Sequence, residues 1–285
     1  METVEVVVEA HNQLGEGPLW DSRTQTLYWV DIEQSTILSY QPDTRSVTQH
    51  RVDRQVTSLG KSAGGRLIVT HRTGFSYYSP DTNTLQPILD IIQEDPDLRF
   101  NDGRVDPLGS YFAGTYSKSH RPIGKLYRFS PPDGLDIIEE GLINSNGIGW
   151  SPDNRIMYHT DTGRKTIYAY DYDPLTGAVA NRRVFVQVPE EKGEGVPDGL
   201  AVDEHGFIWS ARYYGSRIVR YDPDGKVERE IRLPVENITS CAFGGKDLCT
   251  LFITTAASSA RSPLDGALFQ LVGDIKGLEP PTFIA

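Results

Sequence analysis

The sequence predicts an all-β protein, specifically a six-bladed β-propeller with four-stranded blades. Two observations lead to this fold class. A unit of about 40–50 residues recurs along the chain, and a period in this range is typical of propellers and other repeat folds. No long stretch repeats its apolar residues with the helical period of about 3.6, so the sequence predicts few helices.

The most regular part of the unit is a tight turn followed by a strand of β-branched and aromatic residues. Such residues suit a pleated, half-buried surface, and the turns use Asp, Pro, Asn and Gly, which tolerate turn geometry. Six copies occupy residues 20–31, 61–70, 105–114, 150–161, 202–211 and 243–254. A second turn separates the two later strands of a unit, at residues 40–43, 79–81, 130–134, 172–174 and 221–225.

The two ends of the chain are expected to meet in the last blade. The final unit begins at Thr239 and contains three clear strands, the last of them at residues 267–272. A spare strand lies at the N-terminus, at residues 4–9. We expect it to complete the last blade, because this closes the ring and hides an open sheet edge. The prediction is one propeller domain over residues 1–285, whereas a β-sandwich would not need equivalent repeated units.

Composition narrows the classes of partner. The 28 basic and 39 acidic residues leave a formal charge of −11, which argues against nucleic acid and anionic membranes and is compatible with a cation or a neutral ligand. Two Cys exclude a disulfide scaffold and fit a reducing compartment. No apolar run approaches the roughly 18 residues of a membrane helix, and no signal peptide is visible. We expect a cytoplasmic monomer or weak oligomer with a small-molecule partner.

The lengths of the connections predict which face of the ring is functional. Four connections are longer than the others, at residues 88–100, 116–124, 188–197 and 257–266. Because connections alternate between the two faces of a blade, the strand register places all four on one face. Long loops on a rigid scaffold are where function concentrates. The innermost strands begin at this face.

At that position four blades carry a polar residue followed by Gly, namely Glu16, Asp102, Asn146 and Asp198. Residues at the same position of the repeat lie at the same height near the axis of a closed ring. These side chains are therefore expected to converge at one channel mouth, with Asn101 beside them. The Gly after each polar residue has no Cβ, which lets the backbone come close to the site. As an alternative, Asp-Gly and Asn-Gly are only turn signals. Their recurrence at the same position of four repeats favours a binding site.

Converging carboxylates would repel each other and shift each other's pKa unless a cation lay between them. The sequence therefore predicts a divalent metal ion. Because no His or Cys occupies this position of the repeat, the expected ligands are all oxygen atoms. Such ligands favour Ca²⁺, Mg²⁺ or Mn²⁺ over Zn²⁺ or Fe²⁺. Other chemistries have little support, because the chain has no Gly-x-Ser-x-Gly nucleophile elbow and its six His are scattered.

The same residues resemble a known family. Residues 99–115 read Arg-Phe-Asn-Asp-Gly-Arg-Val-Asp-Pro-Leu-Gly-Ser-Tyr-Phe-Ala-Gly-Thr, which is similar to the central signature of the senescence marker protein, gluconolactonase and regucalcin family. Further matching motifs lie at residues 15–20, 145–150, 196–200 and 239–245. The resemblance therefore covers essentially the whole chain, in order.

The resemblance implies a six-bladed propeller with one catalytic divalent metal ion. Its expected activity is that of a carboxylic-ester hydrolase acting on sugar (aldono-)lactones, such as gluconolactone or a pentonolactone. Matching the motifs position by position implies that Glu16, Asn146 and Asp198 are metal ligands. Asp198 is implied to be the proton donor and acceptor as well.

The resemblance also assigns the substrate contacts. It implies that Arg99 and Asn101 contact the substrate, and it leaves Asp102 as a carboxylate behind the metal ligands. Animal regucalcins place an acidic substrate contact shortly after the Ala-Gly-Thr motif, but residues 116–120 read Tyr-Ser-Lys-Ser-His here. This departure leaves the substrate preference open. The alternative is a non-catalytic propeller that binds calcium or a partner, although Arg99 and Asn101 favour a polar small-molecule substrate.

Overall fold

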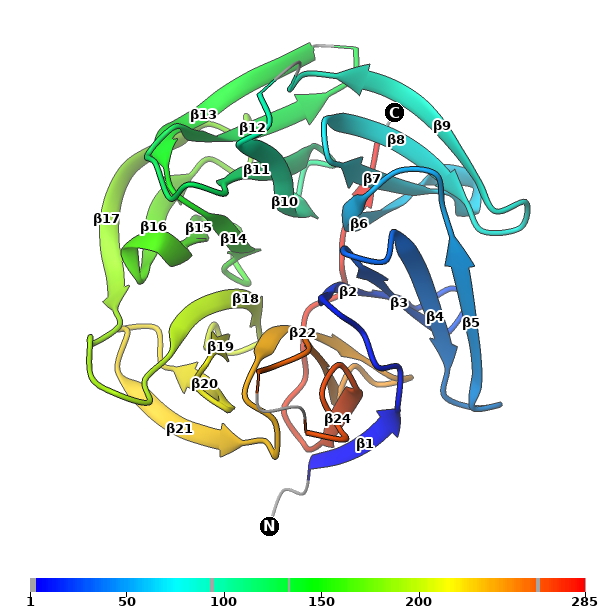
Figure 1. Ribbon diagram of the computed structural model, residues 1–285. Coiled ribbons are helices and arrows are strands. Elements are labelled where there is room, and N and C mark those ends of the chain that lie inside the picture. Colours follow the sequence, from blue (N-terminus) through cyan, green and yellow to red (C-terminus); the bar gives the residue numbers. More distant parts are fainter. Residues whose placement is uncertain (1–3, 93–94, 133, 260–261, 285) are drawn as a thin grey trace.

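The computed structural model describes residues 4–92, 95–132, 134–259 and 262–284. Six antiparallel sheets are arranged as blades around a central axis, with their first strands innermost (Figure 1). The predicted all-β, six-bladed propeller with four-stranded blades is confirmed. Among the described residues the only helical segments are the short turns η1 (Ala63–Gly65) and η2 (Thr162–Arg164), and no helix is long and apolar enough to cross a membrane.

The first three blades follow each other along the chain. Blade 1 consists of β2 (Gly15–Asp21), β3 (Thr26–Asp31), β4 (Thr36–Gln41) and β5 (Ser46–Arg51). Blade 2 consists of β6 (Val56–Ser62), β7 (Leu67–His71), β8 (Gly74–Ser79) and β9 (Thr84–Asp90). Blade 3 consists of β10 (Leu98–Val105), β11 (Tyr111–Ser117), β12 (Gly124–Ser130) and β13 (Gly134–Leu142).

The remaining blades complete the ring. Blade 4 consists of β14 (Ser145–Trp150), β15 (Ile156–Asp161), β16 (Thr166–Tyr172) and β17 (Val179–Gln187). Blade 5 consists of β18 (Val196–Val202), β19 (Ile208–Tyr213), β20 (Arg217–Tyr221) and β21 (Val227–Arg232). Blade 6 consists of β22 (Ile238–Gly244), β23 (Thr250–Thr255), β24 (Leu268–Val272) and β1 (Val4–Val8).

The N-terminal strand closes the ring as predicted. The order in blade 6 is β1-β24-β23-β22, and β1 pairs antiparallel with β24. Val4 lies opposite Leu271 and Val6 opposite Phe269. Because blade 6 takes its outermost strand from one end of the chain and its inner strands from the other, the ends of the ring are held together by a sheet.

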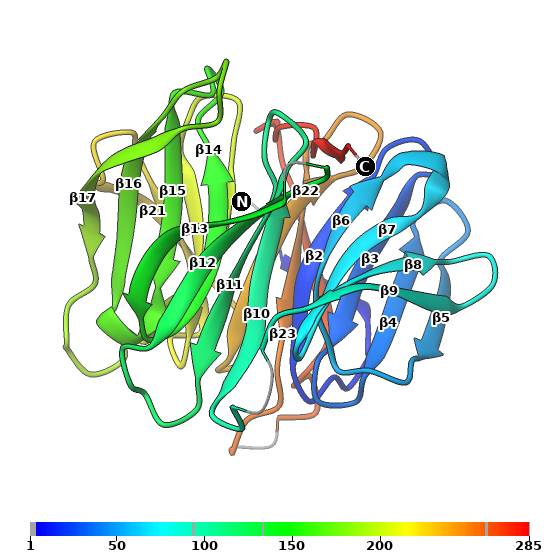
Figure 2. The same ribbon diagram turned by 90° about the horizontal axis from the view of Figure 1, so that it is seen from above.

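The segment that follows β24 was not predicted to have any structure. It runs across the middle of the ring from β22 towards β8 (Figure 1). It ends in β25 (Thr282–Phe283), which pairs in parallel with β6 and gives blade 2 a fifth strand. We call residues 273–284 the tail. Figure 2 shows the tail on the face opposite the long connection that follows β23, so the ring has a tail face and a loop face.

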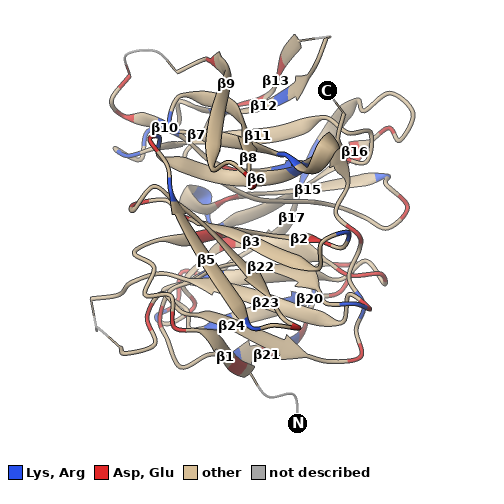
Figure 3. Cartoon of the chain, turned by 90° about the vertical axis from the view of Figure 1, so that its right-hand side faces the viewer, with Lys and Arg blue, Asp and Glu red and all other residues tan. Residues whose placement is uncertain are grey.

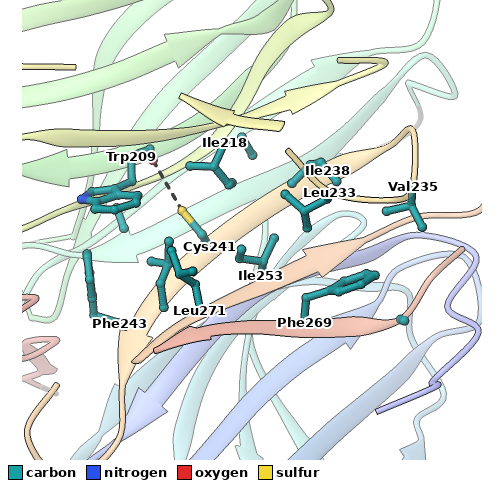
Figure 4. Close-up of a cluster of buried hydrophobic side chains, with 14 residues drawn as sticks. Trp209, Ile218, Leu233, Val235, Ile238, Cys241, Phe243, Ile253, Phe269 and Leu271 are labelled. Atoms are coloured by element: carbon teal, nitrogen blue, oxygen red, sulfur yellow. Dashed lines mark hydrogen bonds between the residues drawn. The ribbon is translucent and has the colours of Figure 1, made fainter. Parts of the chain in front are cut away.

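The core lies between the blades. Each of six buried apolar clusters combines residues of two neighbouring blades. Figure 4 shows the cluster between blades 5 and 6, where Trp209 and Phe243 meet edge to face and Cys241 Sγ donates to the carbonyl oxygen of Trp209 at 3.4 Å. Inner strands such as β22 are buried throughout, whereas outer strands such as β5 are mostly exposed. Acidic and basic positions are interspersed on the loops and strand ends (Figure 3).

Candidate active site and metal centre

A cavity of about 510 Å³ opens at the loop-face end of the channel. Five of the sequence-predicted residues line it together: Glu16, Arg99, Asn101, Asn146 and Asp198. Each is at least nine-tenths buried. The cavity is therefore lined by polar side chains from four strands that are far apart in the sequence: β2, β10, β14 and β18.

A β-bulge at the same height of every inner strand directs these side chains. The pairing of the first strand with the second shifts at 16/19, 56/58, 100/103, 146/148, 197/200 and 238/240. A bulge leaves residues unpaired and re-aims side chains, and it is common beside functional sites. Glu16, Asn101, Asn146 and Asp198 all lie within or next to these shifts.

Asp102 does not line this cavity. Asp102 instead lines a small space of about 20 Å³ together with Arg104 and the tail residues Pro280 and Pro281, and its Oδ1 accepts a hydrogen bond from the Gly103 amide at 2.8 Å. Asn101 and Asp102 are the two residues inside the bulge between Phe100 and Gly103, and they line different cavities. The expectation that Asp102 would reach the mouth with the other polar residues is therefore wrong.

A chain of hydrogen bonds crosses from blade 3 to blade 5. Asn101 Nδ2 donates to Asn146 Oδ1 at 2.7 Å, and Asn146 Nδ2 donates to Thr162 Oγ1 at 2.7 Å. Thr162 Oγ1 in turn donates to the carbonyl oxygen of Pro197, the residue before Asp198, at 2.7 Å. Thr162 lies in η2, outside the repeated inner strands, so the repeat pattern gives no signal for it.

Arg99 is fixed against the same network. Its Nη1 donates to Asn101 Oδ1 at 2.5 Å and to the carbonyl oxygen of Phe100 at 2.9 Å, and its guanidinium lies over the Tyr116 ring at 4.9 Å. Tyr116 and His120 both line the cavity, so the stretch that lacks a carboxylate forms part of the wall. The cation is therefore held in one orientation beside the acidic side chains.

Two buried Asp residues position the chain just before two of the predicted metal ligands. The carboxylate of Asp31 accepts hydrogen bonds from the amides of Gln13 and Leu14, at 2.8 and 3.2 Å. In the same way the carboxylate of Asp161 accepts hydrogen bonds from the amides at residues 143 and 144, at 3.3 and 3.0 Å. The signal was present in the sequence, since both Asp residues end the repeated second strand of their units.

The carboxylates of the cavity are destabilised as anions. Burial, with the nearby charge of Asp102 as a smaller cause, raises the pKa of Glu16 to about 8. Burial raises the pKa of Asp198 well above its ordinary value, and the charges of Glu16 and Asp102 raise it further. Arg99 counters this only in part. A cation inside the cavity would reverse these shifts.

The donor set fits a hard divalent ion. Asp198 Oδ1 is buried and has no hydrogen-bond partner among the described residues, which is costly unless another group satisfies it. Carboxylate and amide oxygens of Glu16, Asn146 and Asp198 are ligand types that such ions prefer. Within the described ranges no group of three or more His, Cys, Asp or Glu is arranged to hold a metal ion, and this predicted set contains only two acids and an amide.

Fold and cavity together define a class: a six-bladed propeller whose inner strands bring oxygen-bearing side chains to one end of the channel. The model of the SMP-30/gluconolactonase/LRE-like region matches residues 14–257. The chain therefore belongs to that family, and the resemblance found in the sequence is confirmed.

Individual relatives agree over almost the whole length. The chain is 33% identical over 291 residues to the regucalcin of Danio rerio, covering 98% of each. It is 35% identical over 290 residues to the "Putative sugar lactone lactonase YvrE" of Bacillus subtilis (strain 168), covering 98% of this chain and 99% of the other. Of solved structures, a luciferin-regenerating enzyme matches with a TM-score of 0.93 at 28% identity, covering 100% of both chains. A calcium-binding protein, regucalcin of Agrobacterium tumefaciens, matches with a TM-score of 0.94 at 25% identity, covering 100% of this chain and 98% of the other.

Proposed function

We propose that this protein is a carboxylic-ester hydrolase that opens sugar (aldono-)lactones, such as gluconolactone or a pentonolactone, to the aldonic acid, and that it requires one divalent metal ion. Membership of the family and the name of the Bacillus subtilis relative support lactone hydrolysis as the class of reaction. The observation that carries the proposal is the bare, buried Oδ1 of Asp198 in a cavity shared with a second buried acid. A divalent ion would give this oxygen a partner and would balance the negative charges of Glu16 and Asp198.

Glu16, Asn146 and Asp198 would hold the ion. Their oxygen donors favour Ca²⁺, Mg²⁺ or Mn²⁺, and the Agrobacterium relative is itself described as calcium-binding. When bound, such an ion supplies Lewis acidity that polarises a carbonyl oxygen or a water molecule.

The protein's own groups then account for binding and proton transfer. Arg99 and Asn101 would hydrogen-bond the sugar hydroxyls and hold the lactone in one orientation. Asp198 would take a proton from the attacking water and deliver it to the ring oxygen as the ester C–O bond breaks. One water is thereby added across one ester bond, and the carboxylate is regenerated.

The test is hydrolysis of gluconolactone and of a pentonolactone by untreated, chelator-stripped and metal-restored protein. We expect stripping to abolish turnover and one of the divalent ions to restore it. Asp198→Asn should lower kcat/KM by about 10³-fold, within the range for loss of a general acid–base. Glu33→Gln is the matched control, because Glu33 lines the same cavity but is not one of the proposed ligands.

A second candidate is a propeller that binds calcium without catalysis, favoured by the calcium-binding description of the Agrobacterium relative. The same experiment separates the two. Rates equal to spontaneous hydrolysis in all three preparations, together with calcium binding that Asp198→Asn weakens, would establish the second candidate and overturn the first.

A further inference from the structure

A second cavity, of about 320 Å³, opens at the other end of the channel, on the tail face. We call it the tail-face cavity and define it by Arg104, Trp150, Phe243, Leu278, Pro280 and Pro281, which are among the residues that line it. It shares none of its lining with the loop-face cavity. Its volume falls within the range of about 300–1,000 Å³ that is typical of small-molecule sites.

The tail builds one wall of this cavity and is firmly attached on both sides of it. Before the wall, Gly277 N donates to the carbonyl oxygen of Leu248, and Glu204 N donates to that of Lys276, both at 2.9 Å. After the wall, Phe283 is fully buried in the core between blades 2 and 3. The cavity is therefore formed before any ligand arrives, which lowers the entropic cost of binding.

Arg104 brings a positive charge to the cavity. The acid that its charge acts on is the nearby Asp102, whose pKa burial raises and Arg104 lowers to a smaller extent. In the described part of the chain Arg104 makes no ion pair, and the hydrogen bond from its Nη2 to the carbonyl oxygen of Leu200 is long at 3.4 Å. Glu279, an acid in the same lining, is already engaged by Lys61 and Ser22. A guanidinium carries five N–H donors, so most of those of Arg104 remain available to a ligand.

Apart from Arg104, Asn154 and Glu279, the side chains that line the cavity are apolar. Trp150 and Phe243 supply aromatic surface, and Pro280 and Pro281 supply rigid aliphatic surface without amide donors. A guanidinium pairs best with a carboxylate, which it can contact through two parallel hydrogen bonds. Aromatic and proline walls favour a flat ring behind that carboxylate.

From this arrangement we propose that the tail-face cavity is a second ligand site, and that it binds a small organic acid consisting of one carboxylate on a flat, apolar ring. The carboxylate lies against Arg104 and the ring lies between Trp150 and the prolines. The site is independent of the lactonase proposal, since it uses none of the residues assigned to that reaction.

Benzoate is a suitable probe because it has this chemistry and fits the volume. The full chain, freed of metal with a chelator, is labelled with 5-fluorotryptophan and titrated while its ¹⁹F spectrum is followed. The chain has four Trp residues, which we expect to give separate signals, and Trp150→Phe assigns the one from the cavity. We expect saturable binding in which the Trp150 signal shifts most, because the other three Trp lie outside the cavity lining.

Two comparisons test the role of charge. Benzamide, a neutral molecule of the same shape, should bind at least about ten-fold more weakly than benzoate, as should benzoate to Arg104→Gln, because each loses a charged hydrogen bond. Arg99→Gln should leave benzoate affinity unchanged, since Arg99 lies in the loop-face cavity.

Three outcomes overturn the proposal. They are no shift of the Trp150 signal at saturating benzoate, equal affinity for benzoate and benzamide, and loss of binding in Arg99→Gln with retention in Arg104→Gln. The benzamide comparison uses the unaltered protein, so it decides the matter even where Arg104→Gln fails to fold.

Discussion

At the scale of single residues, the orientation of the Asn146 amide is determined by Thr162. The Thr162 hydroxyl has one hydrogen, which it donates to the carbonyl oxygen of Pro197, so it can only accept from Asn146. The Asn146 nitrogen must therefore face Thr162, and its oxygen must face Asn101 and the cavity. An amide turned the other way would present hydrogens to a cation.

We expect Thr162→Val to weaken divalent-metal binding by about ten-fold or more, in line with the effect of residues that orient metal ligands. The substitution keeps the shape but leaves the Asn146 nitrogen and the Pro197 carbonyl oxygen without their partner. Isothermal titration calorimetry with Mn²⁺ or Ca²⁺ measures the change. Thr162→Ser retains the hydroxyl and should bind metal almost as the unaltered protein does. Equal weakening in both variants would mean that the hydroxyl does not orient the amide.

The raised pKa values of Glu16 and Asp198 predict how pH affects the metal-free protein. Each acid has a higher pKa in the folded than in the unfolded chain, so the folded state binds more protons between the two values. The free energy of unfolding should therefore fall as pH rises from about 4.5 to about 8, the ordinary and raised pKa of Glu16, by up to about 1.4 kcal/mol per pH unit for each ionising group.

Urea unfolding at several pH values, with and without a divalent ion, measures this effect. Glu16→Gln should flatten the slope, because it removes one of the two acids. A saturating divalent ion should also oppose the fall, since it stabilises the ionised forms. A metal-free protein whose stability rises across this range would contradict the prediction.

At the scale of elements, the inner strands lie too close together for side chains at certain glycines. A Cβ added to Gly147 on β14 would lie 2.7 Å from the amide nitrogen of Leu200 and 2.8 Å from the carbonyl oxygen of Asp198, both on the backbone of β18. Gly147 therefore sets the distance between β14 and β18. Through that distance it also sets where Asp198 lies relative to Asn146.

We expect Gly147→Ala to push β18 away and to weaken metal binding by about ten-fold or more, because metal sites require ligands held in a narrow geometry. Gly149→Ala on the same strand is the control. Its Cβ would meet only the ends of the Leu200 and Val202 side chains, at 2.8 and 2.9 Å. It should lower stability by about 1–3 kcal/mol through overpacking and leave metal affinity unchanged. Calorimetry and urea unfolding on both variants give the two quantities, and identical metal affinities would contradict the prediction.

At the scale of the whole molecule, two terminal segments of the chain hold the blades of the ring together. The N-terminal β1 completes blade 6, and the tail crosses the opposite face to reach blade 2. The tail inserts Phe283 between blades 2 and 3, where its ring stacks on Phe129 with 5.8 Å between centroids. The tail therefore joins blades that are not neighbours in the sequence.

Phe283→Ala should lower the free energy of unfolding by about 3–5 kcal/mol, the range for removing a fully buried aromatic side chain. Ile284→Ala is the matched control, because Ile284 is 65% exposed and should cost no more than about 0.5 kcal/mol. Urea unfolding measures both. Equal stability of the two variants would show that the tail does not contribute through Phe283.

Much of the fold could be predicted from the sequence, because each blade is a local structure. The four strands of each of blades 1 to 5 are consecutive, so the repeated turns and strands reveal the number of blades, and the unpaired strand at residues 4–9 reveals the closure. The tail could not be predicted in this way. It repeats no turn or strand pattern, and its path depends on contacts with residues more than 170 positions away, such as Lys61 and Gly109.

Part of the candidate site could likewise be predicted from the sequence, and part of it could not. The sequence by itself determined which residues stand at the start of the inner strands and face the axis, because position within the repeat sets height in a closed ring. Only the tertiary structure decided that Asn101 faces the cavity while Asp102 lies beneath it, and that Thr162 orients Asn146. Those outcomes depend on the local geometry of a bulge and on hydrogen bonds between separate blades, which no periodicity along a single chain encodes.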